Sequence, residues 1–499
     1  MDFLALDASD QLRALASRRI SAVEALDLAI ARAERLQTEV NAISGRRVEA
    51  ARLEAHHIDQ ARSRGDPLGC LAGLPITVKD TLDVEGMPAS AGRADLLQRD
   101  ARDAVSVGLL RAQGAVVWAH TNVPVNAGDW QTYNPVYGTT RNPWKLDRTP
   151  GGSSGGSAAA LAAGITSLEV GADIAGSLRI PASFCGVFAH KPTFGTISQK
   201  GLVPPYEGEL DMAVVGPLAR SGRDLKMLFR VLAGEAVAAS AAPRPEALRV
   251  GLWIDERSYA LDASVLDLVE TFAAKLAAAG LQVRSTHGPV PGAEVLETYT
   301  SLMYPLLWED APPAELALYR ILRGPARLAR RLGAGPLSWA QGVLGATSGP
   351  EARWAAQEAR IRRASDVSSF FERFDVIVAP CAPTAAFPHT QRGIPAARRL
   401  RLSDGRSVGY LQLMTWGALA SVWGLPATAV PIGFTPEGLP VGAQLIGPQG
   451  ADLQLLELAE FITDRLGGFV APTLTTVEGN DMAAQPVATS PVEHSGSRP

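Results

Sequence analysis

Short apolar runs alternate with helical patterns in the early part of the chain. Residues 74–78 form an apolar run of strand length that ends at Lys79, and residues 115–119 form a second one. Between them, residues 104–113 have the apolar spacing of a helix, and Gly114 is placed to cap it. This order of strand, helix, glycine and strand predicts a mostly parallel sheet with helical crossovers.

Similar elements are predicted on both sides of this unit. Ser21 and Glu24 have the spacing of a capping box, which predicts a helix that runs to about Leu36. The run SAAALAA at 157–163 contains no charge, so we expect a helix buried against the sheet. Three further strands are predicted at 166–170, 248–254 and 374–379, and a short helix is predicted at 178–185.

Residues 290–365 are helical in pattern and rich in leucine, alanine and arginine. The aromatic residues of this segment are Tyr299, Tyr304, Trp308, Tyr319, Trp339 and Trp354. They either line a substrate entrance or form the core of amphipathic helices. We take the segment as a candidate substrate entrance, and the core-packing alternative stays open.

Composition restricts the class of protein. The chain has 499 residues, of which 46% are hydrophobic and 20% charged, and its formal net charge is −4. These values predict a globular protein without the basic field that nucleic acid requires. One basic run is best explained as the solvated face of a helix. It comprises Arg320, Arg323, Arg327, Arg330 and Arg331.

Other functional classes are disfavoured by what the chain lacks. Its three cysteines include no C-x-x-C pair, so neither a disulfide framework nor a metal site is expected. The first residues do not read as a signal peptide, and no apolar run has the length of a membrane span. We therefore predict a cytoplasmic protein that does not bind a membrane. Residues 471–499 are polar and without pattern, which predicts a disordered tail after a single domain at 1–470.

Two serines lie beside glycine-rich turns. Ser153 belongs to the run GGSSGGS, which is either a flexible linker or a loop that opens a helix. The run also fits a hydrolase nucleophile elbow, but the proline-containing stretch before it makes a poor strand. Ser177 follows a predicted strand and a tight turn and begins a helix, where free N–H groups can hold an oxyanion. The alternative for Ser177 is a simple helix cap.

Lys79 is the third candidate. A lysine at the end of a strand usually faces solvent, which is the simpler interpretation. To act as a base, its amine must be neutral near pH 7, although the pKa of a free lysine is about 10.4. Burial and hydrogen bonds to hydroxyl groups lower such a pKa.

Three motifs together resemble the amidase signature family. They are PITVKD around Lys79, TPGGSSGGSAAA around Ser153 and GADIAGSLRIPASFCG around Ser177. The similarity extends to HKPTFGTIS after the signature and to GLPVGAQLIGP near the C-terminus, and covers most of residues 10 to 466. Several separated motifs in the same order make this resemblance specific.

The resemblance implies a fold and a set of roles. The fold is α/β, with a mixed, largely parallel central sheet covered by helices on both faces. Ser177 is the nucleophile, Ser153 the bridging serine after a cis Gly152–Ser153 bond, and Lys79 the base. The oxyanion donors are the backbone N–H groups of Ile174, Ala175, Gly176 and Ser177. The reaction is hydrolysis of a carboxylic amide through an acyl-enzyme, without metal or cofactor.

The sequence departs from the family's usual pattern at a few positions. Ala175 replaces the first of two glycines before the nucleophile, and an alanine there is strained if the turn needs a positive φ. Asn126 replaces a common glutamate, and Ala189 and His190 replace a more usual Gly-Leu. The first change touches the oxyanion hole, whereas the others concern the choice of substrate.

The expected substrate is a small amide-type molecule, and aliphatic amides, anilides, oligoamides and carbamates all remain open, with esters as a side activity. Trp130, Tyr133 and Tyr137 are candidate walls of the substrate pocket, and core packing is the alternative. We expect a monomer or homodimer. The first alternative function is a glutamine-amidotransferase-type subunit that supplies ammonia to charged tRNA within a complex. The second is a non-catalytic binding protein, which retention of all three relay residues disfavours.

Overall fold

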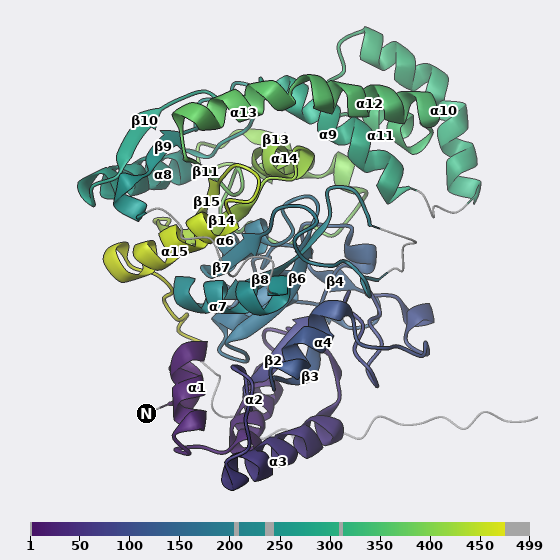
Figure 1. The fold of residues 1–499 in the computed structure, drawn as a ribbon. Helices are drawn as coiled ribbons and strands as arrows, with labels where there is room; N and C mark the ends of the chain where they lie inside the picture. Colours follow the sequence, from purple (N-terminus) through teal and green to yellow (C-terminus); the bar gives the residue numbers. More distant parts are fainter. Residues whose placement is uncertain (1, 204–208, 235–243, 309–312, 475–499) are drawn as a thin grey trace, which may run out of the picture.

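The computed structural model describes residues 2–203, 209–234, 244–308 and 313–474 (Figure 1). Within these ranges, eleven strands form one sheet that runs through the molecule. In spatial order the strands are β1 (Ile43–Arg46), β3 (Val116–Thr121), β2 (Pro75–Lys79), β6 (Leu168–Asp173), β8 (Val214–Ala219), β7 (Phe188–Lys191), β14 (Ala427–Phe434), β15 (Pro440–Ile446), β11 (Val376–Pro380), β9 (Arg249–Leu252) and β10 (Gln282–Ser285). Two small hairpins accompany it, β4 (Tyr133–Asn134) with β5 (Gly138–Thr139) and β12 (Arg399–Arg401) with β13 (Ser407–Gly409).

Parallel and antiparallel pairs occupy different parts of the sheet. The pairs β3–β2, β2–β6, β11–β9 and β9–β10 are parallel. The pairs from β6 to β11 through β8, β7, β14 and β15 are antiparallel, as is β1–β3. The predicted mixed sheet is confirmed, but parallel pairs do not predominate. The sequence pattern revealed the crossovers, whereas it did not reveal that β14 and β15 are joined by a short turn, which imposes antiparallel pairing.

The helices predicted in the N-terminal half are present. They are α2 (Ala22–Leu36), α4 (Val105–Ala112), α5 (Gly155–Ala162) and α6 (Arg179–Cys185), and both hydrogen bonds of the Ser21 capping box are formed. The remaining helices are α1 (Ala8–Ala16), α3 (Val48–Arg64), α7 (Gly222–Ala233), α8 (Ala263–Ala278), α9 (Gly292–Leu307), α10 (Pro313–Arg331), α11 (Trp339–Ala346), α12 (Pro350–Arg362), α13 (Ala364–Arg373), α14 (Thr415–Val422) and α15 (Asp452–Leu466).

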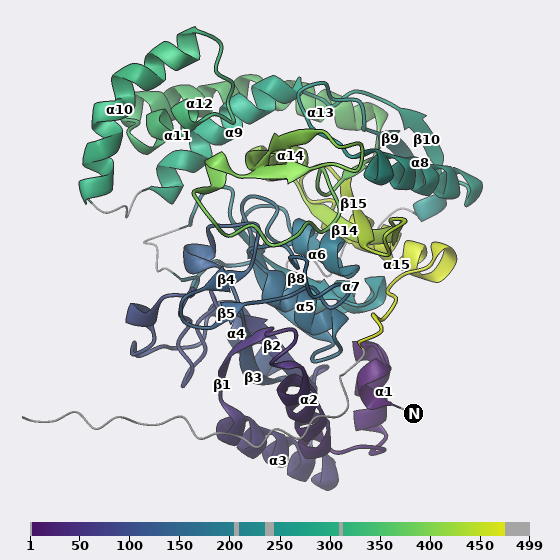
Figure 2. The same cartoon turned by 180° about the vertical axis from the view of Figure 1, so that it is seen from behind.

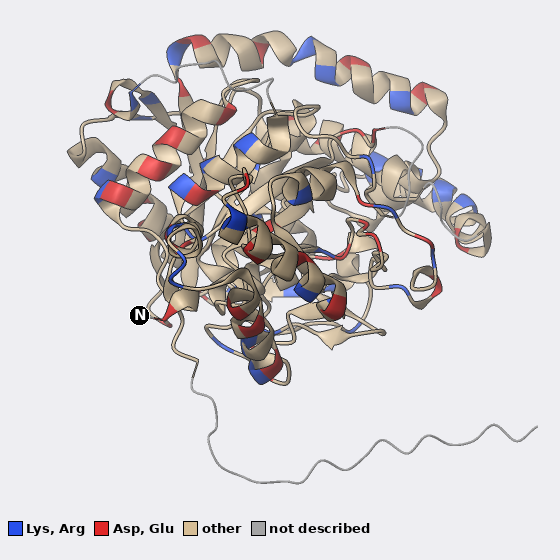
Figure 3. Cartoon of the chain, turned by 60° about the horizontal axis from the view of Figure 1, so that its bottom comes forward, with Lys and Arg blue, Asp and Glu red and all other residues tan. Residues whose placement is uncertain are grey.

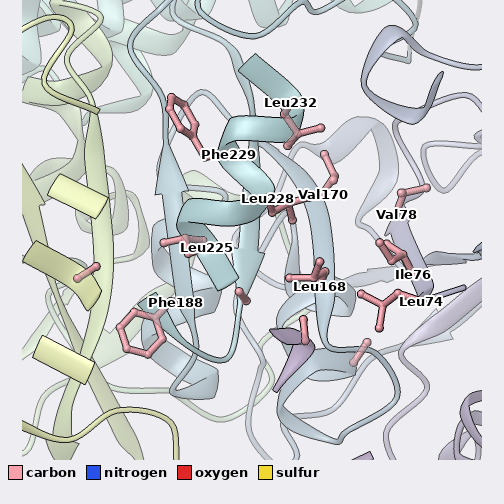
Figure 4. Close-up of a cluster of buried hydrophobic side chains, with 14 of the residues drawn as sticks. Leu74, Ile76, Val78, Leu168, Val170, Phe188, Leu225, Leu228, Phe229 and Leu232 are labelled. Carbon is pink, nitrogen blue, oxygen red and sulfur yellow. The ribbon is translucent and has the colours of Figure 1, made fainter. Parts of the chain in front are cut away.

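Helices cover both faces of the sheet, as predicted. Neighbouring residues of β7 point to opposite faces, because side chains alternate along a strand. Phe188 packs in the cluster that contains Leu225, Leu228 and Phe229 of α7 (Figure 4). Ala189 packs instead with α5 and α6, which Figure 2 shows in front of the sheet. Every residue of α5 is buried, which explains why its sequence carries no charge.

The segment at 290–365 is helical, as predicted, and comprises α9 to α12. Figure 1 shows these helices at the end of the molecule opposite α1 to α3. The aromatic residues of the segment differ in burial, and Trp308 and Tyr319 are intermediate. Tyr299 and Tyr304 of α9 are buried, whereas Trp339 and Trp354 are 48% and 69% exposed. The core-packing alternative therefore holds for Tyr299 and Tyr304.

Charged residues of both signs are mixed along the surface helices (Figure 3). In the parts of the chain that the structure describes, no helix has both the length and the apolar character needed to cross a bilayer. Residues 475–499 of the predicted tail lie outside the described residues, so the predicted domain boundary at 470 stays a prediction.

Candidate active site

Lys79 and Ser153 are in direct contact. Lys79 is the last residue of β2, and Ser153 lies in the glycine-rich turn that leads into α5. Lys79 Nζ donates a hydrogen bond of 2.7 Å to Ser153 Oγ, and each residue is only 1% exposed. The Gly152–Ser153 peptide bond is cis, as the resemblance implied. The glycine-rich run is therefore a buried part of the site and not a linker.

Ser177 lies beside this pair. It is placed in the turn between β6 and α6, and it is 6% exposed. The Ser154 N–H donates to the Ser177 carbonyl at 3.2 Å, which holds the two serine-bearing turns together. The Ser177 hydroxyl makes no hydrogen bond to Ser153 Oγ within the described ranges. Ser177 does not cap α6 either, because α6 has no side-chain hydrogen bond at its N-terminus.

The amine of Lys79 is about half deprotonated near pH 7. Burial lowers its pKa to about 7, although the charges of Asp173 and Glu169 oppose this shift. A half-neutral amine at pH 7 can accept a proton, which an exposed lysine cannot do to a useful extent. The structure thus excludes the solvent-facing interpretation of Lys79.

Glu169 was not among the residues singled out from the sequence. It lies in β6, is fully buried, and accepts hydrogen bonds from Thr77 and from Thr121, the latter at 2.9 Å. Burial raises its pKa to about 8, although these hydroxyl groups and Lys79 oppose the shift. A single acid within the apolar run SLEVG was the signal that could have revealed it.

A buried ion pair holds the turn before Ser177. Arg179 donates to both oxygens of Asp173 at 3.0 Å, and both side chains are inaccessible to solvent. Burial opposes ionisation of Asp173, but the charge and hydrogen bonds of Arg179 outweigh it and lower the pKa to about 2. Asp173 Oδ1 also accepts the Gly176 N–H at 2.9 Å. This hydrogen bond removes Gly176 from the four expected oxyanion donors.

Three N–H groups of the expected set stay free. Those of Ile174, Ala175 and Ser177 have no acceptor among the residues that the structure describes. Ala175 does not have a positive φ, so the alanine is accommodated without strain. Gly176 supplies the positive φ of 87° instead.

Two aromatic side chains orient the peptide groups of this turn. Tyr299 OH donates to the Ile174 carbonyl at 2.9 Å, and Trp130 Nε1 donates to the Ala175 carbonyl at 2.8 Å. In a trans peptide the N–H points away from its C=O. Tyr299 therefore directs the Ala175 N–H away from itself, and Trp130 directs the Gly176 N–H toward Asp173.

The three candidate pocket residues have different surroundings. Trp130 is 8% exposed, and its polar atom supports the turn. Tyr133 OH donates to Asp129 at 3.0 Å and accepts from Arg398 at 2.8 Å, within a buried ion pair. Tyr137 is half-buried in the loop of the β4–β5 hairpin, and burial raises the pKa of its phenol. Their contact with a substrate stays a prediction.

Apart from Ala175, Asn126 and His190 also depart from the family pattern, and neither forms a hydrogen bond to Lys79, Ser153 or Ser177 within the described ranges. Asn126 is exposed in a loop with φ 52°. His190 is buried in β7, between Thr428 at 2.8 Å and Asp452 at 3.0 Å. Within the described part of the chain, no group of three or more His, Cys, Asp or Glu is arranged to hold a metal ion.

A family model described as Amidase matches residues 24–456. The chain belongs to the amidase signature family. It is therefore an enzyme of the hydrolase class that acts on carbon–nitrogen bonds, and its fold is that of the family's solved structures.

Similar proteins of known name fall into two groups. The A subunit of glutamyl-tRNA(Gln) amidotransferase from Cyanothece sp. (strain PCC 7425) is 33% identical over 466 residues, which cover 87% of this chain and 92% of that protein. A crystal structure of an amidase is 30% identical with a TM-score of 0.77 and covers 92% of this chain and 100% of that one. The 6-aminohexanoate cyclic dimer hydrolase, solved in complex with substrate, is 27% identical with a TM-score of 0.75, over 95% of this chain and 100% of that one.

Proposed function

We propose that this enzyme hydrolyses a small carboxylic amide through an acyl-enzyme on Ser177. The observation that carries the proposal is the 2.7 Å contact between Ser153 Oγ and a buried amine with a pKa of about 7. Such a pair is a ready proton acceptor, and Ser177 lies in the adjoining turn. The similarity to an amidase and to 6-aminohexanoate cyclic dimer hydrolase supports the same class of substrate.

The first half of the reaction forms the acyl-enzyme. Neutral Lys79 takes the Ser153 proton while Ser153 takes the Ser177 proton, and Ser177 Oγ attacks the substrate carbonyl carbon. The free N–H groups of Ile174, Ala175 and Ser177 stabilise the resulting oxyanion. This proton transfer requires Ser177 Oγ to move into hydrogen-bonding distance of Ser153 when substrate binds.

The second half releases the products. Ser153 returns a proton to the leaving nitrogen, because an amine leaves as a neutral molecule and not as an anion. The C–N bond then breaks and the acyl group stays on Ser177. Water, deprotonated by the same relay, attacks the ester, and the carboxylic acid leaves as Ser177 recovers its proton.

The second candidate is an amidotransferase component that releases ammonia from glutamine. The observation that favours it is the 32% to 34% identity to the A subunits of glutamyl-tRNA(Gln) amidotransferase from several organisms. Both candidates use the same acyl transfer and differ in the substrate and in the need for partner subunits.

A hydrolysis panel with the purified chain alone tests the proposal. It includes glutamine, an aliphatic amide, an anilide, a linear oligoamide, a carbamate and an ester, with both products measured by liquid chromatography. We expect turnover of a non-glutamine amide that is lost in Ser177→Ala. Turnover of glutamine alone favours the amidotransferase component, and turnover that survives in Ser177→Ala refutes the acyl-enzyme.

A further inference from the structure

A buried acid shares the sheet face of the proposed base and takes no part in the steps above. Glu169 in β6 is the register partner of Thr77 in β2, two residues before Lys79. Residues two apart in a strand point to the same face, so Thr77 and Lys79 lie on one side of the sheet. Glu169 is 0% exposed. An ionised carboxylate is costly in such a place unless hydrogen bonds or a nearby cation stabilise it.

Hydroxyl groups from several elements enclose this carboxyl. Thr77 of β2 donates to Oε2, and Thr121 of β3 donates to Oε1 at 2.9 Å. Ser157 Oγ lies 2.8 Å from Thr121 Oγ1, so the hydrogen-bond network extends into α5. Hydroxyl groups can turn to accept as well as donate, so this network accommodates the carboxyl with or without its proton.

Few other charged groups act on the Lys79 amine. The helix α5, which covers this face, carries no charge. His120 of β3 hydrogen-bonds to the Leu82 carbonyl through Nε2, and its Nδ1 lies 3.4 Å from Asp80. Asp173 raises the pKa of Lys79 more than Glu169 does. Its oxygens are bound by Arg179 and by the turn, and its pKa of about 2 keeps it ionised, so its effect is constant near neutral pH. Glu169 forms no ion pair with an arginine in the described ranges. Lys79 is the cation whose charge acts on it.

We propose that Glu169 is a positioning residue that strengthens Lys79 as a base by placing a titratable carboxyl on the same buried face. The proposal rests on the function proposed above, in which Lys79 accepts the proton. A fully buried amine with no negative charge nearby has a pKa as low as about 5 to 6. So weak a base is a poor acceptor for the Ser153 proton. A carboxyl beside it offsets part of that loss.

The two groups titrate together. Because burial moves the pKa of Glu169 up to about 8 and that of Lys79 down to about 7, each group's charge affects the other over the same pH range. When the pair holds a single proton, that proton is on Glu169 with a free amine, or on Lys79 beside a carboxylate. The second arrangement delays full deprotonation of Lys79 and broadens the pH profile.

The pH dependence of Ser177 sulfonylation tests this without knowledge of the substrate. Phenylmethanesulfonyl fluoride forms an Oγ–S bond with Ser177, its S–F bond breaks, fluoride leaves, and the Ser177 proton passes to the relay. In the wild type we expect the inactivation rate to rise with pH over two steps. In Glu169→Gln we expect a single step, shifted to lower pH by about half a unit to one unit, and a lower plateau rate.

Asp224→Asn is the matched control. Asp224 is also a buried acid whose pKa is raised by burial, but it lies in α7 on the other face of the sheet. We expect its profile to keep the wild-type shape. An unshifted profile in Glu169→Gln, or an equal shift in Asp224→Asn, would overturn the proposal, because a merely structural lesion lowers the plateau without moving the steps.

Two further measurements provide a substitute variant and locate the sulfonyl group. If Glu169→Gln does not fold, Thr121→Val tests the same coupling. It removes a hydrogen bond that lowers the pKa of Glu169, so its profile must shift in the same direction. Mass spectrometry of the wild type locates the sulfonyl group. Labelling at Ser177 with an unshifted variant profile refutes this inference alone, whereas absence of labelling at Ser177 refutes the proposed function as well.

Discussion

The hydroxyl of Tyr299 provides a sharp test of how the turn at residues 174–177, which carries the proposed oxyanion donors, is held in place. Tyr299→Phe removes the donor of the 2.9 Å hydrogen bond to the Ile174 carbonyl and leaves the ring in place. Tyr299 is 0% exposed, so no water can easily replace the lost donor. The Ile174 carbonyl is part-buried, so we expect the loss of this partner to lower the free energy of unfolding in urea by up to about 1–3 kcal/mol.

The effect on catalysis follows from the same peptide group. The Ile174 carbonyl and the Ala175 N–H belong to one peptide, so a carbonyl that is free to turn takes an oxyanion donor with it. Complete loss of one donor costs about 100-fold to 1,000-fold in kcat. Loss of the hydrogen bond that orients it, at about 1 kcal/mol, corresponds to roughly 5-fold. We therefore expect kcat to fall between these limits, with little change in KM.

The matched control is Tyr304→Phe. Tyr304 lies in the same helix and is 8% exposed, and its hydroxyl makes no hydrogen bond within the described residues. We expect it to leave both the urea midpoint and kcat near the wild-type values. If Tyr299→Phe lowers stability but kcat stays unchanged, then the Ile174–Ala175 peptide does not act in the oxyanion hole, and our account of the turn is wrong.

Further predictions concern the base, the ion pair and an N-terminal cap. Lys79→Met should lower amide hydrolysis by about 100-fold or more without loss of fold by circular dichroism, and an active variant would exclude the lysine as the base. Wild-type kcat/KM should rise as pH increases through about 7, because the neutral amine is the reactive form, and a falling rate there would contradict this. Asp173→Asn leaves Arg179 buried without its partner and should cost about 3–5 kcal/mol in urea unfolding. Since the pKa of Asp173 is lowered to about 2, the pair should stabilise the wild type fully above pH ~4 and lose this effect as pH falls toward 2. If Asp173→Asn is as stable as the wild type at neutral pH, the stabilising role of the ion pair is refuted. Ser21→Ala should cost about 1 kcal/mol, since it breaks the capping box, and a change near zero would mean that the cap is not formed in solution.

The sequence was sufficient for the parts of the site that depend on local pattern. The strand that ends at Lys79 and the helix after the Gly/Ser run are encoded in contiguous residues, and both form as expected. The pairing of Lys79 with Ser153 was implied by resemblance, because the two residues are far apart in the chain. No spacing rule relates them.

The parts that could not be predicted depend on contacts between distant elements. Tyr299 lies 125 positions from Ile174, and its role became visible only when α9 was placed beside the turn. The hydrogen bond from the Trp130 indole N–H to the Ala175 carbonyl was not predicted either, whereas the role of Trp130 as a pocket wall stays a prediction. The loss of Gly176 as a donor follows from the rotamer of Asp173, which no pattern of residue types encodes. The antiparallel centre of the sheet was missed for a similar reason.

The hydrogen bond from Tyr299 has a consequence for the evolution of substrate range. The helix that carries it, α9, belongs to the segment predicted to admit the substrate, so this one helix would connect the predicted entrance with the turn before Ser177. Exchanging the whole segment for that of a relative would alter turnover along with selectivity. Changes at exposed positions such as Trp339 and Trp354, which do not touch the turn, are the safer route to a new specificity.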